Sequence, residues 1–115
     1  MNTDNELIAD FMGYEVLDKY PRHNIVAPES GGRKFYLRNK MKYQTSWDWL
    51  MPVVEKIESL RHYVLIDTGS CEIGGDDVPV SISYENGDTK IKMVYLAVIE
   101  FINWHNENKI DSVNN

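Results

Sequence analysis

The sequence contains a single cysteine, Cys71, among 115 residues. One thiol excludes an internal disulfide, and a chain of this length can build one core without such a crosslink. No segment approaches the roughly 20 apolar residues that span a membrane, and the acidic N-terminus lacks the apolar run of a signal peptide. These absences predict a cytoplasmic protein that has no disulfide and does not enter a membrane.

Basic residues are also few, because 12 Lys and Arg stand against 18 Asp and Glu, which gives a formal net charge of −6. General binding of nucleic-acid backbones needs clustered cations. The densest basic group runs from Arg33 to Lys42 and includes Arg38. It is typical of a solvated strand face, with a local anion patch as the alternative. We therefore expect no general nucleic-acid binding.

Motifs for metals and cofactors are missing. The histidines His23, His62 and His105 are isolated, without HExxH or Cys–His spacing, and the glycine-rich pieces match neither a phosphate-binding loop nor a dinucleotide fingerprint. We expect no metal site, no cofactor and no catalytic residues. A loose acidic set could offer oxygens to Ca²⁺, but its spacing is not that of an EF-hand and favours solvated turns. Its members are Asp67, Glu72, Asp76 and Asp77.

The stretch Leu65-Ile66-Asp67-Thr68-Gly69-Ser70 is similar to the active-site loop of aspartic peptidases. That chemistry needs two carboxylates sharing a proton, so a chain with one such loop would have to act as a homodimer. The surrounding helices do not fit such an enzyme, and a strand ending in a turn is favoured. Cys71 lies in a predicted strand, where a lone cysteine is more typical of a small buried residue than of a nucleophile.

Hydrophobic periodicity predicts an α+β fold: a single domain, residues 1–115, in which a mainly antiparallel sheet is layered with about three helices as an α/β/α-type sandwich. Gly13 is expected to end the first helix. The third helix is expected to run from about Asp88 to Asn106, with a frayed tail over 107–115. The predicted strands are 14–17, 34–37, a weaker 41–43, 63–67, 71–73 and 78–84.

The third helix is apolar around more than half of its circumference. Its main apolar face and a second row, which consists of Met93, Ala97, Phe101 and Trp104, leave only a narrow polar face. The second row is expected to pack on the second helix, or else to serve a partner or a second copy of the chain. The residues predicted to face water are Lys92, Leu96, Glu100, Asn103 and Glu107.

The second helix contains two tryptophans in the stretch TSWDWLMPVVEKIESL. Trp49 shares the core-facing stripe, whereas Trp47 lies off it and is a candidate binding residue. Thr45 and Asp48 have capping-box spacing, and a helix beginning near Asp48 or Trp49 would place Pro52 in its first turn. Trp104 and His105 are further candidates. They would form a cleft for a ring or a peptide if Trp47 lies near Trp104.

Three segments carry a resemblance to a known family: ELIADFMG, YQTSWDWLMPVVEKIE and KIKMVYLAVIEFINWHNEN. They resemble the phage ABA sandwich domain, a family of small proteins encoded by phages and prophages. The resemblance implies helices layered on a sheet and a bacterial host cell as the location. It implies no activity and no catalytic residue.

The sequence favours a non-enzymatic protein-interaction module, an accessory protein that binds a host or phage protein. A small-ligand binder for a nucleotide or metabolite is the alternative, with Arg33, Arg38 and the aromatic residues as its ligand contacts. A homodimeric aspartic-type peptidase using the Asp67 loop is third. The candidate binding residues are Trp47, Trp104, His105 and Arg38.

Overall fold

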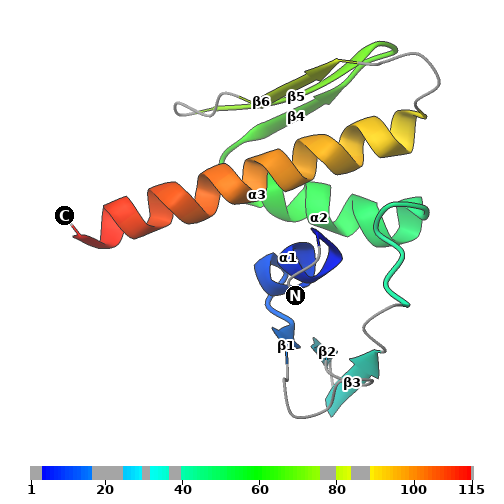
Figure 1. The fold of residues 1–115 in the computed structure, drawn as a ribbon, viewed down its shortest axis with the longest axis vertical. Helices are drawn as coiled ribbons and strands as arrows, with labels where there is room; N and C mark the ends of the chain where they lie inside the picture. The colour runs from blue at the N-terminus through cyan, green and yellow to red at the C-terminus, as the bar shows by residue number, and fades with distance from the viewer. Residues whose placement is uncertain are drawn as a thin grey trace.

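The computed structural model describes residues 4–16, 25–29, 32–36, 40–75, 80–83 and 89–114. Within these ranges the chain forms three helices and two three-stranded antiparallel sheets (Figure 1). The predicted single-domain α+β class is confirmed. In chain order the elements are α1 (Asp4–Phe11), β1 (Glu15–Val16), β2 (Ile25–Glu29), β3 (Gly32–Tyr36), α2 (Trp47–Ser59), β4 (Tyr63–Ile66), β5 (Ser70–Gly74), β6 (Val80–Ser83) and α3 (Lys90–Asn114).

Helix α1 ends where the sequence predicts. Gly13 has a φ of 86°, a backbone conformation that glycine adopts without strain. Its N–H donates to the Asp10 carbonyl at 3.0 Å, and the N–H of Tyr14 donates to the Ala9 carbonyl at 2.8 Å. This pair of hydrogen bonds is a Schellman motif, so Gly13 closes the helix and turns the chain toward β1.

Helix α2 begins earlier than predicted. The N–H groups of Trp49 and Leu50 both donate to the carbonyl of Ser46, at 3.1 and 3.0 Å, so Ser46 is the N-cap and Trp47 the first helical residue. Ser46 makes no side-chain capping bond, and the predicted capping box of Thr45 and Asp48 is wrong. Pro52 therefore lies inside the helix, on its exposed side, beyond the first turn.

The sheet β4–β5–β6 supplies one wall of the core. The register pairs Ile66 with Cys71 and Cys71 with Ile82, and the side chains of Cys71, Ile73 and Val80 are buried on the inner face. On the opposite face Tyr63 and Leu65 are 51% and 55% exposed. Side chains also alternate along β6, where Val80 is buried and Ile82 half-buried, whereas Ser81 and Ser83 are exposed.

The segment between β3 and α2 differs from the prediction. Met41 and Tyr43 do not form the weak strand that was expected, because residues 40–46 are turn and irregular chain. Both side chains are nevertheless buried in the core. Strand β2, which pairs with β1 and β3, was not predicted, because Pro28 interrupts its pattern.

Helix α3 lies in the middle of the molecule, with β5 and β6 on one side and α1 and α2 on the other. The order of layers is thus sheet, central helix and outer helices (Figure 1). All five positions predicted to face water are exposed. In the second row Met93, Ala97 and Phe101 are buried, so the chain itself covers most of the surface that a second copy would need.

The C-terminal tail also departs from the prediction. The backbone of α3 stays helical to Asn114, well beyond the expected end near Asn106. No glycine or proline follows Asn106, so the sequence contains no residue that would terminate a helix.

Candidate functional site

Trp47 lies at the start of α2 and is 38% exposed. Met51, one turn further along the same helix, is 39% exposed. The two side chains share a face by their spacing of four residues. The buried residues of α2 point the other way, toward the core. Three acidic residues are also exposed along α2: Asp48, Glu55 and Glu58.

Trp49 has a different role. It is half-buried, and its ring meets the buried Tyr43 ring edge-on at a centroid distance of 5.2 Å. Its predicted place on the core-facing stripe is therefore supported. The contact joins α2 to the turn that precedes it, so Trp49 holds the start of the helix against the core.

Trp104 and His105 belong to an aromatic cluster centred on the fully buried Phe101. His105 stacks on Phe101 at 5.7 Å, and Trp104 lies 5.9 Å from the same ring. His62 contacts Phe101 at 5.2 Å and Trp104 at 6.1 Å. Phe11 closes the cluster edge-on at 6.0 Å. These contacts join α1, α3 and the start of β4, so Trp104 is chiefly a packing residue.

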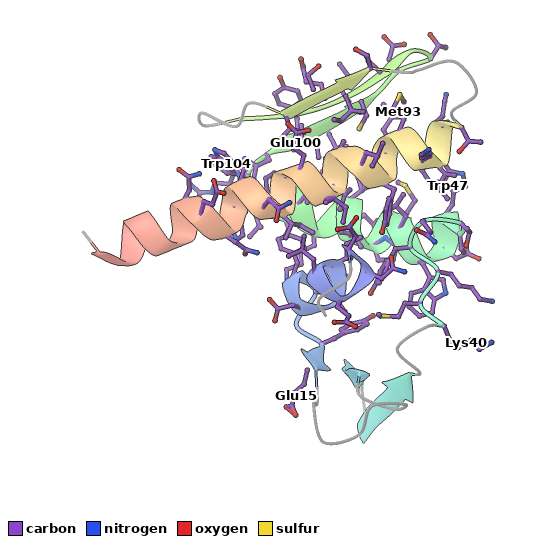
Figure 2. All side chains as sticks on the ribbon, viewed as in Figure 1. Glu15, Lys40, Trp47, Met93, Glu100 and Trp104 are labelled. Atoms are coloured by element: carbon purple, nitrogen blue, oxygen red, sulfur yellow. The ribbon has the colours of Figure 1, made fainter. Side chains whose placement is uncertain are left out.

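The predicted cleft between Trp47 and Trp104 does not form. Figure 2 shows the two side chains at opposite ends of the helical layer. Helices α2 and α3 both run in the same direction across the molecule (Figure 1). Trp47 opens α2, whereas Trp104 contacts His62, which follows the end of α2, so their separation follows from the topology. The two tryptophans therefore cannot contribute to one site.

His105 instead lines an open pocket of about 270 Å³. Its ring meets Phe11 edge-on at 5.7 Å. The ammonium of Lys56 donates a hydrogen bond to the carbonyl oxygen of Phe11 and lies 4.9 Å from the centroid of the Phe11 ring. The pocket is lined by Asp10, Phe11, Lys56, Leu60, His105 and Asn106.

This pocket combines apolar surface with polar groups that can orient a ligand, and its lining is more polar than that of a typical small-molecule site. Phe11 and Leu60 supply apolar surface, and Asn106 supplies an amide. Lys56 supplies a cation that is half-buried. Sequence reasoning missed Lys56, because its partner Phe11 lies 45 residues earlier in the chain.

Several predicted residues fall outside the described part of the chain. Arg38 is one, and Asp76 and Asp77 are two others. Of Arg33 only the backbone is described, in β3. Among the described residues no three His, Cys, Asp or Glu side chains are grouped so that they could hold a metal ion.

The Asp67 loop is the tight turn between β4 and β5. The N–H of Asp67 donates to the Ser70 carbonyl at 2.8 Å, and the N–H of Thr68 donates to Asp67 Oδ1 at 2.7 Å. The carboxylate thus stabilises its own turn, as Asp commonly does. Glu72 lies elsewhere, on the outer face of the sheet, where it accepts a hydrogen bond from the Tyr63 hydroxyl at 2.9 Å.

Cys71 is fully buried on the inner face of β5. Burial raises the pKa of its thiol to about 11. Because the thiolate is the nucleophilic form, this thiol is poorly suited to covalent catalysis at neutral pH. The expected role as a small buried residue is confirmed.

Comparison with known proteins identifies no relative of this chain. No family model matches the chain, and no curated protein or solved structure matches it either. The resemblance to the phage ABA sandwich domain therefore stays a prediction. In the described part of the chain no helix is both long and apolar enough to cross a membrane.

Proposed function

We propose that the chain is a non-enzymatic interaction module, a phage- or prophage-encoded accessory protein that binds a host or phage protein in the bacterial cytoplasm. The observation that supports this function is the exposed pair Trp47 and Met51 on the outer face of α2. The rest of α2 buries its apolar residues in the core. An exposed Trp next to a Met is the composition of a contact surface, because these residues are enriched at interfaces.

The surroundings of the pair indicate the chemistry of the partner. Asp48, Glu55 and Glu58 are exposed on the same helix, and the chain carries a formal charge of −6. An apolar cavity with a basic rim on the partner would complement this surface. The exposed Tyr63 and Leu65 on the sheet are the competing surface. We favour α2, because Trp is the residue most often found at the energetic centre of an interface.

Affinity capture with the purified chain tests the proposal. Cells carrying the phage or prophage provide the lysate, and the captured protein is then purified and titrated. Trp47→Ala should weaken binding by about 2 kcal/mol, roughly 30-fold, while the thermal unfolding midpoint stays unchanged. Tyr63→Ala, at a more exposed aromatic residue on the sheet, is the control and should bind normally. Loss of binding only in Tyr63→Ala would move the interface to the sheet.

A small-ligand binder is the second candidate, supported by the pocket at Lys56 and His105. The pocket residues differ from the predicted ligand contacts Arg33 and Arg38, whose side chains lie outside the described part of the chain. An aspartic-type peptidase is the weakest candidate, since the Asp67 carboxylate accepts a bond within its own turn. Peptide cleavage that Asp67→Asn abolishes would be needed to revive it. Self-association through α3 stays a prediction, checked by sedimentation.

A further inference from the structure

We infer that the pocket at the ends of α1 and α2 binds a small carboxylate with an apolar body, such as an aromatic acid. The inference rests on the second proposed function and specifies its ligand class. It starts from Lys56, whose half-buried ammonium is part of the pocket lining.

Lys56 retains unused binding capacity. An ammonium has three N–H donors, and one of them donates to the Phe11 carbonyl. The face of the Phe11 ring supplies a second, weaker contact at 4.9 Å. Within the described part of the chain the cation therefore contacts a neutral carbonyl and a ring, and no carboxylate. A partly buried cation is stabilised by an anion that accepts its remaining donors.

The carboxylate of Asp10 does not reverse the preference of the pocket for an anionic ligand. Asp10 also lines the pocket, but its side chain is exposed to water, whereas Lys56 is half-buried. Solvent and salt screen an exposed charge much more than a buried one. The field inside the pocket is therefore dominated by the ammonium, and Asp10 weakens it from the rim.

The other walls define the body of the ligand. Phe11 and Leu60 offer apolar surface, and the His105 ring is held edge-on to Phe11 and stacked on Phe101. An aromatic body can lie against these rings, and the Asn106 amide can orient a polar atom. The volume of about 270 Å³ is slightly below the usual range for drug-sized ligands, so the ligand is small.

The test is a titration followed by ¹⁵N–¹H correlation spectra with three probes of similar size: benzoate, benzamide and benzylamine. A ligand of about nine heavy atoms that gains about 0.3–0.5 kcal/mol per atom binds with a dissociation constant on the order of 1–10 mM. Benzoate should shift the amide signals of His105, Asn106 and residues around Phe11. Benzamide should bind about tenfold more weakly, since it lacks the charge-assisted bond to Lys56.

Three variants separate the charge of Lys56 from its structural role. Lys56→Met keeps the length of the side chain and should weaken benzoate binding about tenfold, whereas Lys56→Arg should retain it. Asp10→Asn should strengthen it by removing the repulsion at the rim. Lys90→Met, at an exposed lysine on α3, is the control and should change nothing.

The outcomes distinguish the ligand class from the function. Equal binding of benzoate and benzamide, or preferential binding of benzylamine, would overturn the carboxylate inference and leave the ligand-binding function standing. Absence of shifts at the pocket with all three probes would overturn the inference. A wider thermal-shift screen that also finds no ligand would then remove the second function itself.

Discussion

Replacing Phe101 by alanine should cost a large part of the stability of this fold. Phe101 is fully buried and lies within 6.0 Å, between ring centroids, of Phe11, His62, Trp104 and His105. Truncation of a buried Phe costs about 3–5 kcal/mol, and contacts between rings add about 0.5–1.5 kcal/mol per pair. We therefore expect about 4–5 kcal/mol, out of a total of roughly 5–15 kcal/mol for a domain.

Urea unfolding followed by tryptophan fluorescence measures this loss. With a slope of about 1.5 kcal/mol per molar urea, the midpoint should fall by roughly 3 M at unchanged slope. Leu96→Ala, at an exposed position of the same helix, is the control and should stay within about 0.5 kcal/mol of the parent. Phe101→Leu retains more apolar volume and should cost about 1–2 kcal/mol, which keeps the test open if the alanine variant does not fold.

A midpoint for Phe101→Ala no lower than that of Leu96→Ala would refute this reasoning. The cluster would then not be the junction of α1, α3 and β4. The same result would weaken the description of the pocket, because His105 is positioned by its stack on Phe101.

The remaining predictions concern the backbone at Gly75 and two buried ionisable groups. Gly75→Ala should lower the free energy of unfolding by about 1–3 kcal/mol, because φ at Gly75 is +131° and the new Cβ would lie 2.8 Å from His62 Nδ1. Gly69→Ala is the control, because a Cβ there meets no atom within 4 Å. Chemical denaturation of the two variants measures the difference. Cys71 should react with a thiol reagent at pH 8 only as fast as the chain opens, so urea should accelerate labelling. Burial raises the pKa of Cys71 from 9.0 to about 11, and burial with the nearby Asp4 raises that of Tyr95 from 10.0 to about 12. Between pH 9 and 12 the folded chain therefore keeps protons that the unfolded chain loses, so the free energy of unfolding should fall as the pH rises through this range. The fall should be smaller in a Cys71→Ser, Tyr95→Phe double variant, which lacks both groups.

Local patterns predicted the parts of the fold that depend on neighbours in sequence. The 3.6-residue periodicity of α3 placed five residues on its water-facing side, and all five are exposed, because burial along a helix follows its own repeat. Gly13 was predictable for a similar reason, since the motif that ends α1 closes within a few residues. The burial of Cys71 was predictable because a lone cysteine within a strand is typically a small buried residue.

Long-range contacts were not predictable in this way. The bond between Lys56 and the Phe11 carbonyl joins residues 45 positions apart, and no local pattern indicates it. His62 precedes a strand and resembles an isolated histidine, yet its Nδ1 is buried, without a hydrogen-bond partner among the described residues, next to Phe101 and Gly75. The pairing of Trp47 with Trp104 failed because a helical wheel places residues around an axis but does not show which ends of two helices meet.

The separation of Trp47 from the pocket at Lys56 makes the two proposed functions independent of each other. Trp47 and Lys56 are nine residues apart in helix α2, so they lie about 14 Å apart along its axis. Trp47 and Met51 occupy the first half, whereas Lys56 and Leu60 line the pocket at the other end. Substitutions that far apart, without shared contacts, act additively to within about 0.5 kcal/mol. Trp47→Ala should therefore leave benzoate binding unchanged, and Lys56→Met should leave the protein partner bound. If either variant affects both, α2 transmits a change between its ends, and the two surfaces belong to one coupled site.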